Sequence, residues 1–293
     1  MFGFVVLGLL AAGGAMVLFD TDSDEEAITT EEEIDSPEVQ GEVLEFDGSQ
    51  AVSGTEGDDT INPGQPLGLE PNEIHLLGGD DVATLDRQVS LGVYGGEGND
   101  SLTGLDYDTP LFGEAGDDTL RGIGGSDLYG GAGNDSITFD NTGAPIDGTA
   151  VLSGGPGDDT ITAWVNVGID APDNGGAVVS GDAGADQFEV VMHVSNSIQD
   201  LNGNGLKANT VRILDFDPSE DRLRIEMDFD EAAEDRVVFA SMEQVEEDGR
   251  FVSVFTFTFP EDPNIPDAAE AVATLTVESK EAFAFSDVSI TRV

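Results

Sequence analysis

The stretch that decides the fold is GGEGNDSL at residues 95–102, in which closely spaced glycines and an aspartate precede a large apolar residue. The same unit returns as GTEGDDTI at 54–61, GEAGDDTL at 113–120, GGAGNDSI at 130–137, GGPGDDTI at 154–161 and GDAGADQF at 181–188. A shortened copy, LGGDDVA, begins at Leu77, and a divergent copy, GIGGSDLY, begins at Gly122. Such an array of short copies predicts a solenoid, in which each copy stacks on its neighbours.

Each copy predicts half a turn and half a strand. Glycines let the chain bend sharply and leave carbonyl oxygens free to point into the turn, and the apolar residue after the aspartate begins a short strand. The shortest intervals between copies are about two nine-residue units, so two units form one coil. We therefore expect an all-β fold, a right-handed parallel β-roll or β-helix over residues 51–199. The aspartates expected in a single column are Asp59, Asp81, Asp100, Asp118, Asp135, Asp159 and Asp186.

The interior of this roll is expected to be narrow, because each copy supplies one inward apolar residue, helped by residues such as Val93, Leu111 and Leu128. The inward residues predicted are Ile61, Leu102, Leu120, Tyr129, Ile137, Ile161 and Phe188. Stacked strands lie ~4.8 Å apart, so neighbouring column carboxylates repel by roughly 3 kcal/mol at an effective dielectric constant of ~20. Without cations such a column is not expected to hold.

Several Ca²⁺ ions between successive coils would remove this repulsion. Each ion would take carboxylates from adjacent coils and carbonyl oxygens from the glycine turns, which suits its preference for 6 to 8 oxygen ligands, and its binding would become folding energy. The candidate metal-ligating residues are Gly54, Gly57, Asp59, Asp81, Gly95, Gly96, Gly98, Asn99, Asp100, Gly113, Gly116, Asp117, Asp118, Gly122, Asp127, Gly130, Gly131, Gly133, Asn134, Asp135, Gly154, Gly155, Gly157, Asp158, Asp159, Gly181, Gly184 and Asp186.

The opposite side of the roll lacks most of this pattern. Its unit between Gly95 and Gly113 has Thr109 where an aspartate belongs, and the next unit is the divergent copy that carries Asp127. Metal binding is therefore expected chiefly on one side. The alternative interpretation, flexible turns of an ordinary β-protein, does not account for so regular an array.

Residues 53–190 resemble the RTX (repeats-in-toxin) region of secreted toxins, proteases and surface proteins of Gram-negative bacteria. The resemblance implies Ca²⁺ binding, a chain that folds only after export, and type I secretion through an uncleaved C-terminal signal. It does not imply one activity, because the family attaches these rolls to many effectors. The apolar N-terminus departs from the family pattern.

The N-terminal segment at residues 1–19 has no charged side chain, and as a helix it would reach ~28 Å, close to the thickness of a bilayer core. We expect it to enter a membrane, either as an uncleaved anchor helix or as a cleaved signal. Residues 20–50 follow as an acidic, disordered linker. The expected location is secreted or at the cell surface.

Composition excludes several partners and chemistries. The chain has 10 Lys and Arg against 61 Asp and Glu, which gives a formal net charge of −51. Binding to nucleic acid or to anionic lipid headgroups is therefore excluded as a function class. No cysteine is present, so the fold has neither disulfides nor thiolate metal sites.

Residues 200–293 are expected to form a β-rich cap over the last coil. Alternation predicts strands in RLRIEMDF at 222–229 and in the phenylalanine-rich run at 251–259, which follows an Asp-Gly hairpin turn. Further strands are expected at 272–277 and 283–290. The segment DLNGNG at 200–205 resembles the start of a calcium loop, but the Glu expected at its twelfth position is Val211, and a polar turn is the other interpretation.

An enzyme is not expected. The chain has no HExxH zinc motif, nucleophile elbow or phosphate-binding loop. The alternative is a calcium-dependent polysaccharide lyase or epimerase, whose candidate residues are Arg87, Arg121, His193 and Tyr107. The favoured interpretation is a structural or adhesive calcium-binding protein. Its Ca²⁺ ions would bridge the acidic surface to anionic polymers or to other copies of the chain.

Overall fold

The structure, a computed structural model, describes most of the chain from residue 40 onward. The described residues are 40–44, 51–61, 73–85, 92–105, 109–142, 149–167, 176–194, 206–207, 211–229, 238–259 and 271–292. Residues 40–293 form one compact unit. The expected anchor at 1–19, nearly all of the linker at 20–50 and the loop at 200–205 lie outside the described residues. No helix in the described part is long and apolar enough to cross a membrane.

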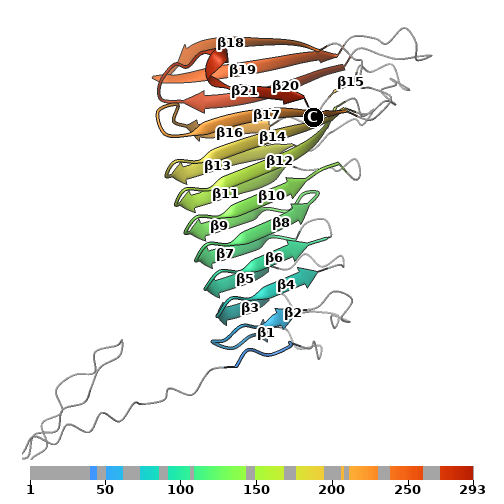
Figure 1. Ribbon diagram of the computed structural model, residues 1–293, viewed down its shortest axis with the longest axis vertical. Coiled ribbons are helices and arrows are strands. Elements are labelled where there is room, and N and C mark those ends of the chain that lie inside the picture. Colours follow the sequence, from blue (N-terminus) through green and yellow to red (C-terminus); the bar gives the residue numbers. More distant parts are fainter. Residues whose placement is uncertain are drawn as a thin grey trace, which may run out of the picture. The chain divides into compact units, whose positions relative to one another are not determined.

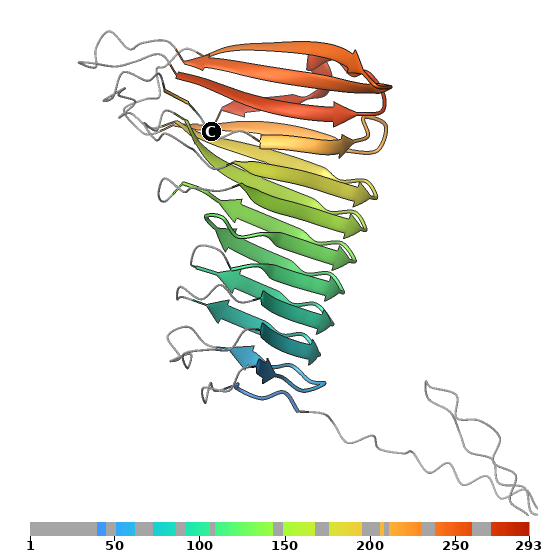
Figure 2. The ribbon, with the colours of Figure 1, turned by 180° about the vertical axis from the view of Figure 1, so that it is seen from behind.

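Two long sheets make up the fold, and the strands alternate between them along the chain (Figures 1 and 2). The first sheet contains β1 (Ala51–Ser53), β3 (Glu73–Gly78), β5 (Gly92–Glu97), β7 (Leu111–Ala115), β9 (Leu128–Ala132), β11 (Ala150–Pro156), β13 (Ala177–Ala183) and β16 (Val211–Phe216). The second contains β2 (Thr60–Ile61), β4 (Val82–Leu85), β6 (Ser101–Gly104), β8 (Thr119–Ile123), β10 (Ser136–Asp140), β12 (Thr160–Val167), β14 (Gln187–Val194), β17 (Arg222–Phe229) and β21 (Ser289–Arg292).

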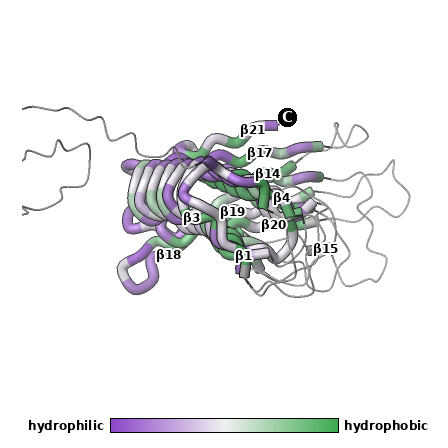
Figure 3. Tube along the Cα trace, turned by 90° about the horizontal axis from the view of Figure 1, so that it is seen from below, coloured by the Kyte–Doolittle hydropathy of each residue, from purple (hydrophilic) through white to green (hydrophobic). Residues whose placement is uncertain are grey.

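Each coil contributes one strand to each sheet, and every pair within these two series is parallel. Strand β5 pairs with β7 through Val93 and Leu111, and β6 pairs with β8 through Leu102 and Leu120. The Gly-Asp turn of each copy joins the strand in the first sheet to the strand in the second. This parallel, two-sheet repeat architecture agrees with the predicted roll. Seen along the stack, the coils lie over one another (Figure 3).

The core lies between the sheets. Each strand from β3 to β11 contributes one or two apolar side chains to it, whereas β12, β14 and β17 contribute four each. Leu102, Leu120, Ile137 and Ile161 stack in register on the second sheet and are at most 1% exposed. On the first sheet, Ile74, Val93, Leu111, Leu128 and Leu152 are fully buried. The predicted narrow apolar interior is therefore confirmed for the coils before β12, and the core is wider than predicted from β12 to β17.

The prediction that Tyr129 points inward is wrong. Leu128 takes the inward position because it pairs with Leu111, whereas Tyr129 pairs with Phe112 on the outer face. There it ends a stack of aromatic rings, His75, Tyr94, Phe112 and Tyr129, with centroids 4.6 to 5.0 Å apart. In the regular copies the inward residue comes two positions after the aspartate, whereas in the divergent copy it comes one position after Asp127. A shift of one residue moves a side chain to the other face of a strand, so the prediction chose the wrong residue.

The turns of successive coils approach too closely to admit side chains at several glycines. A Cβ atom on Gly116, which has a φ of 139°, would lie 1.8 Å from the carbonyl oxygen of Gly98 in the preceding coil. A Cβ on Gly113 would lie 2.2 Å from the Asp118 carboxylate. The glycines of the repeat are therefore required by the contact between coils as well as by the turn itself.

The C-terminal region extends the first sheet instead of forming a separate layer. Strand β20 (Ala271–Ser279) pairs parallel with β16, and β19 (Arg250–Phe259) and β18 (Phe239–Glu247) follow as antiparallel neighbours. The short strand β15 (Leu206–Lys207) also pairs with β20. Asp248 and Gly249 form the predicted hairpin turn, both with positive φ.

The predicted phenylalanine row is core, since Phe255, Phe257 and Phe259 are fully buried. The alternation predicted in β17 is also confirmed, because Leu223, Ile225, Met227 and Phe229 are buried. The strand expected over 283–290 is mostly wrong. Residues Phe285–Asp287 form a short 3-10 turn, closed by Asp287 N–H donating to the Ala284 carbonyl, and only β21 is extended.

Glu114 occupies a position that favours glycine, and this gives a test of the turn geometry. Its φ is 78°, and the equivalent residues Gly96, Gly131 and Gly155 also have positive φ. We expect Glu114→Gly to raise the free energy of unfolding by about 1 kcal/mol over Glu114→Ala, because alanine removes the carboxylate but keeps the strained Cβ. Urea unfolding of both variants measures the difference. Equal stability of the two variants would contradict the turn geometry.

Candidate metal centre

The column of aspartates is a continuous ladder of hydrogen bonds between coils. From Asp81 onward, the Oδ1 atom of each column aspartate accepts the backbone N–H of the column aspartate in the preceding coil. The bonds join Asp59 N to Asp81 Oδ1 (2.6 Å), Asp81 N to Asp100 Oδ1 (2.9 Å), Asp100 N to Asp118 Oδ1 (2.7 Å), Asp118 N to Asp135 Oδ1 (2.8 Å), Asp135 N to Asp159 Oδ1 (2.7 Å) and Asp159 N to Asp186 Oδ1 (2.9 Å). The predicted column of seven aspartates is therefore present.

The second carboxylate oxygen of these side chains is mostly left without a partner. All seven aspartates are at most 2% exposed. The Oδ2 atoms that are buried and accept no hydrogen bond are those of Asp81, Asp100, Asp118, Asp135 and Asp159. A buried carboxylate oxygen without a donor is costly, and a series of them on successive coils indicates a missing positively charged partner.

Backbone oxygens lie close to these unpartnered atoms. The point that a Cβ on Gly95 would occupy lies 2.1 Å from Asp100 Oδ2 and 2.8 Å from the carbonyl oxygen of Gly113 in the next coil. The corresponding point on Gly113 lies 2.2 Å from Asp118 Oδ2 and 2.4 Å from the carbonyl oxygen of Gly130. Carboxylate and carbonyl oxygens therefore gather beside Gly95, Gly113 and Gly130.

A second, exposed ladder runs along the outside of the same turns. Asp80 N–H donates to Asp58 Oδ1 (2.9 Å), and the equivalent bonds of the next coils have lengths of 2.7 to 2.9 Å. The residues of this outer ladder are Asp58, Asp80, Asn99, Asp117, Asn134 and Asp158. Four residues of this ladder, Asn99, Asp117, Asn134 and Asp158, are predicted metal ligands. They alternate between amide and carboxylate, so no two neighbours among them both carry a charge.

Burial and mutual repulsion make the inner carboxylates weak acids. Loss of hydration raises the pKa of Asp81, Asp118 and Asp159 to about 7, and neighbouring carboxylates add to the shift. The same causes raise the pKa of Asp186 to about 6 and raise the pKa of Asp100, where Asp80 and Glu114 are the repelling groups. The backbone N–H bond of the ladder opposes these shifts. At neutral pH the negative charge on these carboxylates is therefore unfavourable in the folded protein.

The side chains form a line and do not converge on one point. Within the described residues, no group of three or more Asp, Glu or His side chains is placed to hold one metal ion. A cation beside the column would therefore depend on one or two carboxylates and on the backbone carbonyls of the glycine turns. Ca²⁺ accepts such mixed oxygen ligands and irregular geometry.

Two predicted ligands lie away from the column. Gly122 is part of β8, and a Cβ on it would meet the Leu128 side chain at 2.8 Å, so it faces the core. Asp127 lies on the opposite turn, where its Oδ1 accepts the Val151 N–H (2.8 Å). Beside it, the Ser126 hydroxyl accepts the Thr109 N–H (3.2 Å). One carboxylate and one hydroxyl hold this turn, so the aspartate column lies on one side of the roll only, as the repeat pattern predicts.

The structure adds one rung that the repeat pattern does not contain. Asp221, in the turn before β17, accepts the Asp186 N–H through Oδ1 (3.0 Å) and is 6% exposed. Its turn, DPSED at 217–221, has no glycine, so a search for the repeat could not find it. The available signal is the following strand, since RLRI repeats the alternation of polar and apolar residues that follows most of the other column aspartates.

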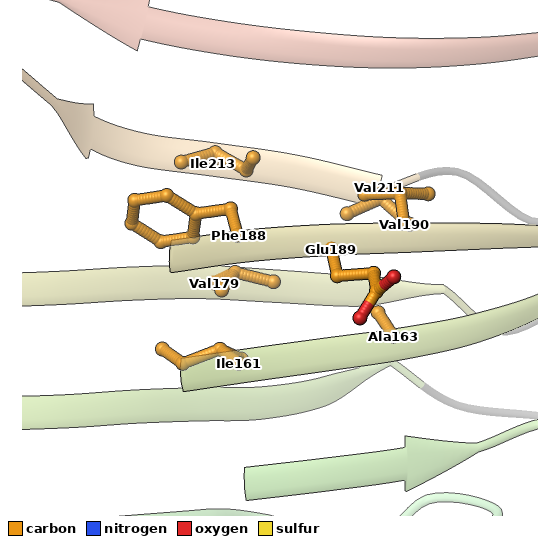
Figure 4. Close-up of a pocket in the computed structure, with 8 residues that line it drawn as sticks. All are labelled: Ile161, Ala163, Val179, Phe188, Glu189, Val190, Val211 and Ile213. Atoms are coloured by element: carbon orange, nitrogen blue, oxygen red, sulfur yellow. The ribbon is translucent and has the colours of Figure 1, made fainter. Parts of the chain in front are cut away.

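The residues proposed for a lyase are not brought together. Arg121 on β8 approaches Asp140 at 3.8 Å, and His193 on β14 contacts Asp228 at 2.8 Å. These strands are three positions apart in the second sheet, or ~14 Å at ~4.8 Å per strand. Arg87 and Tyr107 lie outside the described residues. One pocket, between β12, β13, β14 and β16, is a gap among core side chains such as Phe188 and Ile213 (Figure 4).

Comparison with family models, curated proteins and solved structures gave no match.

The raised pKa values predict how the metal-free protein responds to pH. Because the folded-state pKa values of Asp81, Asp118 and Asp159 lie near 7 and the ordinary value is 3.8, the folded column binds more protons than the unfolded chain between these limits. Stability should therefore rise as pH falls from 8 to about 5. Circular dichroism in a chelator at a series of pH values measures this trend as the folded fraction. A folded fraction that falls between pH 8 and pH 5 would contradict it.

Proposed function

We propose that this protein binds several Ca²⁺ ions along the aspartate column and folds when it does so. The observation that carries the proposal is the row of buried Oδ2 atoms without hydrogen-bond partners on Asp81, Asp100, Asp118, Asp135 and Asp159. In the metal-free state these oxygens must be either protonated or unpaired, and both states cost free energy near neutral pH. A bound cation would give these Oδ2 atoms the positively charged partner that the chain does not provide.

The donor set favours Ca²⁺ over other metals. It consists of carboxylate oxygens and backbone carbonyls, with no cysteine in the chain, and neither of its two histidines is in the column. Zinc and copper prefer nitrogen and sulfur ligands, and Mg²⁺ requires strict octahedral geometry, whereas Ca²⁺ takes 6 to 8 oxygens in flexible arrangements. The residues that would hold the ions are the five aspartates named above and the first glycines of the turns, Gly95, Gly113, Gly130 and Gly154.

We place the protein, on the resemblance of its repeats, among RTX proteins of Gram-negative bacteria that fold in calcium-rich surroundings. A right-handed roll, export to the cell surface or medium and, through residues 1–19, attachment to a membrane belong to the same proposal. Low cytosolic Ca²⁺ would keep the chain unfolded until export, because the repulsion along the column opposes folding there.

We assign the folded roll a structural or adhesive role. The exposed carboxylates of the outer ladder, together with a net charge of −51, offer a dense anionic surface beside the metal column. Ca²⁺ at this surface can join it to anionic polymers or to another copy of the chain, which would make adhesion calcium-dependent.

Calcium titration of residues 40–293 tests the proposal. We expect a cooperative gain of β-structure, seen by circular dichroism, with a midpoint of about 10⁻⁴ to 10⁻³ M. Asp118→Ala and Asp135→Ala should raise the midpoint several-fold, because each removes a carboxylate from the most closely spaced coils.

The matched control is Asp127→Ala, which removes a carboxylate from a turn on the opposite side of the roll. It should raise the midpoint less than Asp118→Ala or Asp135→Ala, through loss of the bond to Val151 alone, and it should leave the number of ions taken up on folding unchanged. A wild-type β-spectrum that neither Ca²⁺ nor chelation changes would reject the proposed function.

A further inference from the structure

The two ends of the aspartate ladder differ from its middle. At the first rung, Asp59 Oδ1 accepts the Glu42 N–H (2.6 Å) and Oδ2 accepts the Thr55 N–H (2.6 Å). At the last rung, Asp221 Oδ1 accepts the Asp186 N–H and Oδ2 accepts the Asp217 N–H (2.7 Å). Both oxygens of each terminal carboxylate therefore have backbone donors, whereas Oδ2 on the five rungs from Asp81 to Asp159 has none.

The local backbone explains this difference at the first rung. Thr55 occupies the second position of its repeat, where the next coils have residues with positive φ, including Leu77 (82°), Gly96 (122°) and Glu114 (78°). Thr55 is not among the residues with positive φ, and its N–H reaches the carboxylate four residues later. In the next coils the left-handed residue changes the direction of the peptide groups, and Oδ2 is left without a donor.

At the last rung a different turn gives the same result. Residues 217–221 contain a proline and no glycine, and Asp221 N–H donates back to the Asp217 carbonyl (2.8 Å). This tight turn places the Asp217 N–H on Asp221 Oδ2. Two unrelated local structures therefore give both oxygens of the terminal carboxylates a backbone N–H donor at opposite ends of the same ladder.

We propose that the metal column stops short of both ends, so that Asp59 and Asp221 are metal-independent caps closed by backbone N–H groups. This inference rests on the proposed calcium binding and assigns it to the five rungs from Asp81 to Asp159. A cation at either end would lie beside an N–H donor, whose positive end repels it, and would have to displace a charge-assisted hydrogen bond. The caps end the row of carboxylates without leaving an ion exposed at the ends of the ladder.

Replacement by asparagine separates the two kinds of rung. In Asp118→Asn, the amide oxygen can still accept the Asp100 N–H, and the amide nitrogen takes the position of an oxygen that has no donor. The variant loses a metal ligand and little else. In Asp59→Asn and Asp221→Asn, the amide nitrogen must face an N–H group, so a hydrogen bond is lost whether or not Ca²⁺ is bound.

The experiment is a Ca²⁺ titration of folding, followed by circular dichroism, for the wild type and these three variants. The slope of the logarithm of the folding constant against the logarithm of Ca²⁺ concentration gives the number of ions taken up on folding. We expect Asp118→Asn to lower this slope by about one ion. Asp59→Asn and Asp221→Asn should keep the wild-type slope and raise the midpoint about twofold, through loss of a hydrogen bond.

A slope that falls in Asp59→Asn or Asp221→Asn as much as in Asp118→Asn would overturn the assignment of the caps and leave the proposed function intact. A wild-type protein that folds without any Ca²⁺ dependence would reject both. If one terminal variant does not fold at any Ca²⁺ concentration, the other decides the question, because the two caps are built from different turns.

Discussion

The rest of the structure depends on the hydrogen bond from one column aspartate N–H to the carboxylate of the next. This bond fixes the distance and register between coils at the turn, where no sheet ladder is available. It also requires the carboxylate to lie under the first glycine of its own repeat, in the space that a Cβ would fill. The glycine at the first position of every full repeat follows from this requirement.

The same bond creates the main unfavourable interaction of the fold. It aligns buried carboxylates on every coil, and burial and repulsion raise their pKa values toward neutrality. The chain offers them few cations, because eight of its ten Lys and Arg residues lie at or after residue 207. There, Arg212 and Arg250 pair with Glu278, and Arg224 pairs with Glu189 and Glu226. The chain itself therefore supplies cations to some carboxylates of the C-terminal strands, whereas none of these ion pairs involves a column aspartate.

The repeat made the parallel roll and the aspartate column predictable, because a glycine turn and a two-residue strand period allow few arrangements. The periodicity of β17 and β19 placed their buried faces correctly for the same reason. Tyr129 and Gly122 could not be placed, since the divergent copy supports two registers and only pairing with Leu111 and Phe112 chooses between them. Asp221 escaped notice because its turn reproduces the geometry of the repeat without its glycines. The capping of Asp59 depends on the φ of a single residue, Thr55, which no pattern of residue types specifies.

The ladder also explains why we propose metal binding on one side of the roll only. On the opposite turn, Thr109 and Ser126 hold successive coils with neutral groups, so insertions there do not disturb a row of charges. The stack from His75 to Tyr129 gives further neutral contact between coils on the outer face of the first sheet.

The most direct measurement of the central claim is anomalous X-ray scattering from crystals of the protein grown with Ca²⁺. The account predicts a row of peaks beside Asp81 to Asp159, one strand spacing apart. An ordered roll with no peak beside these aspartates would contradict it.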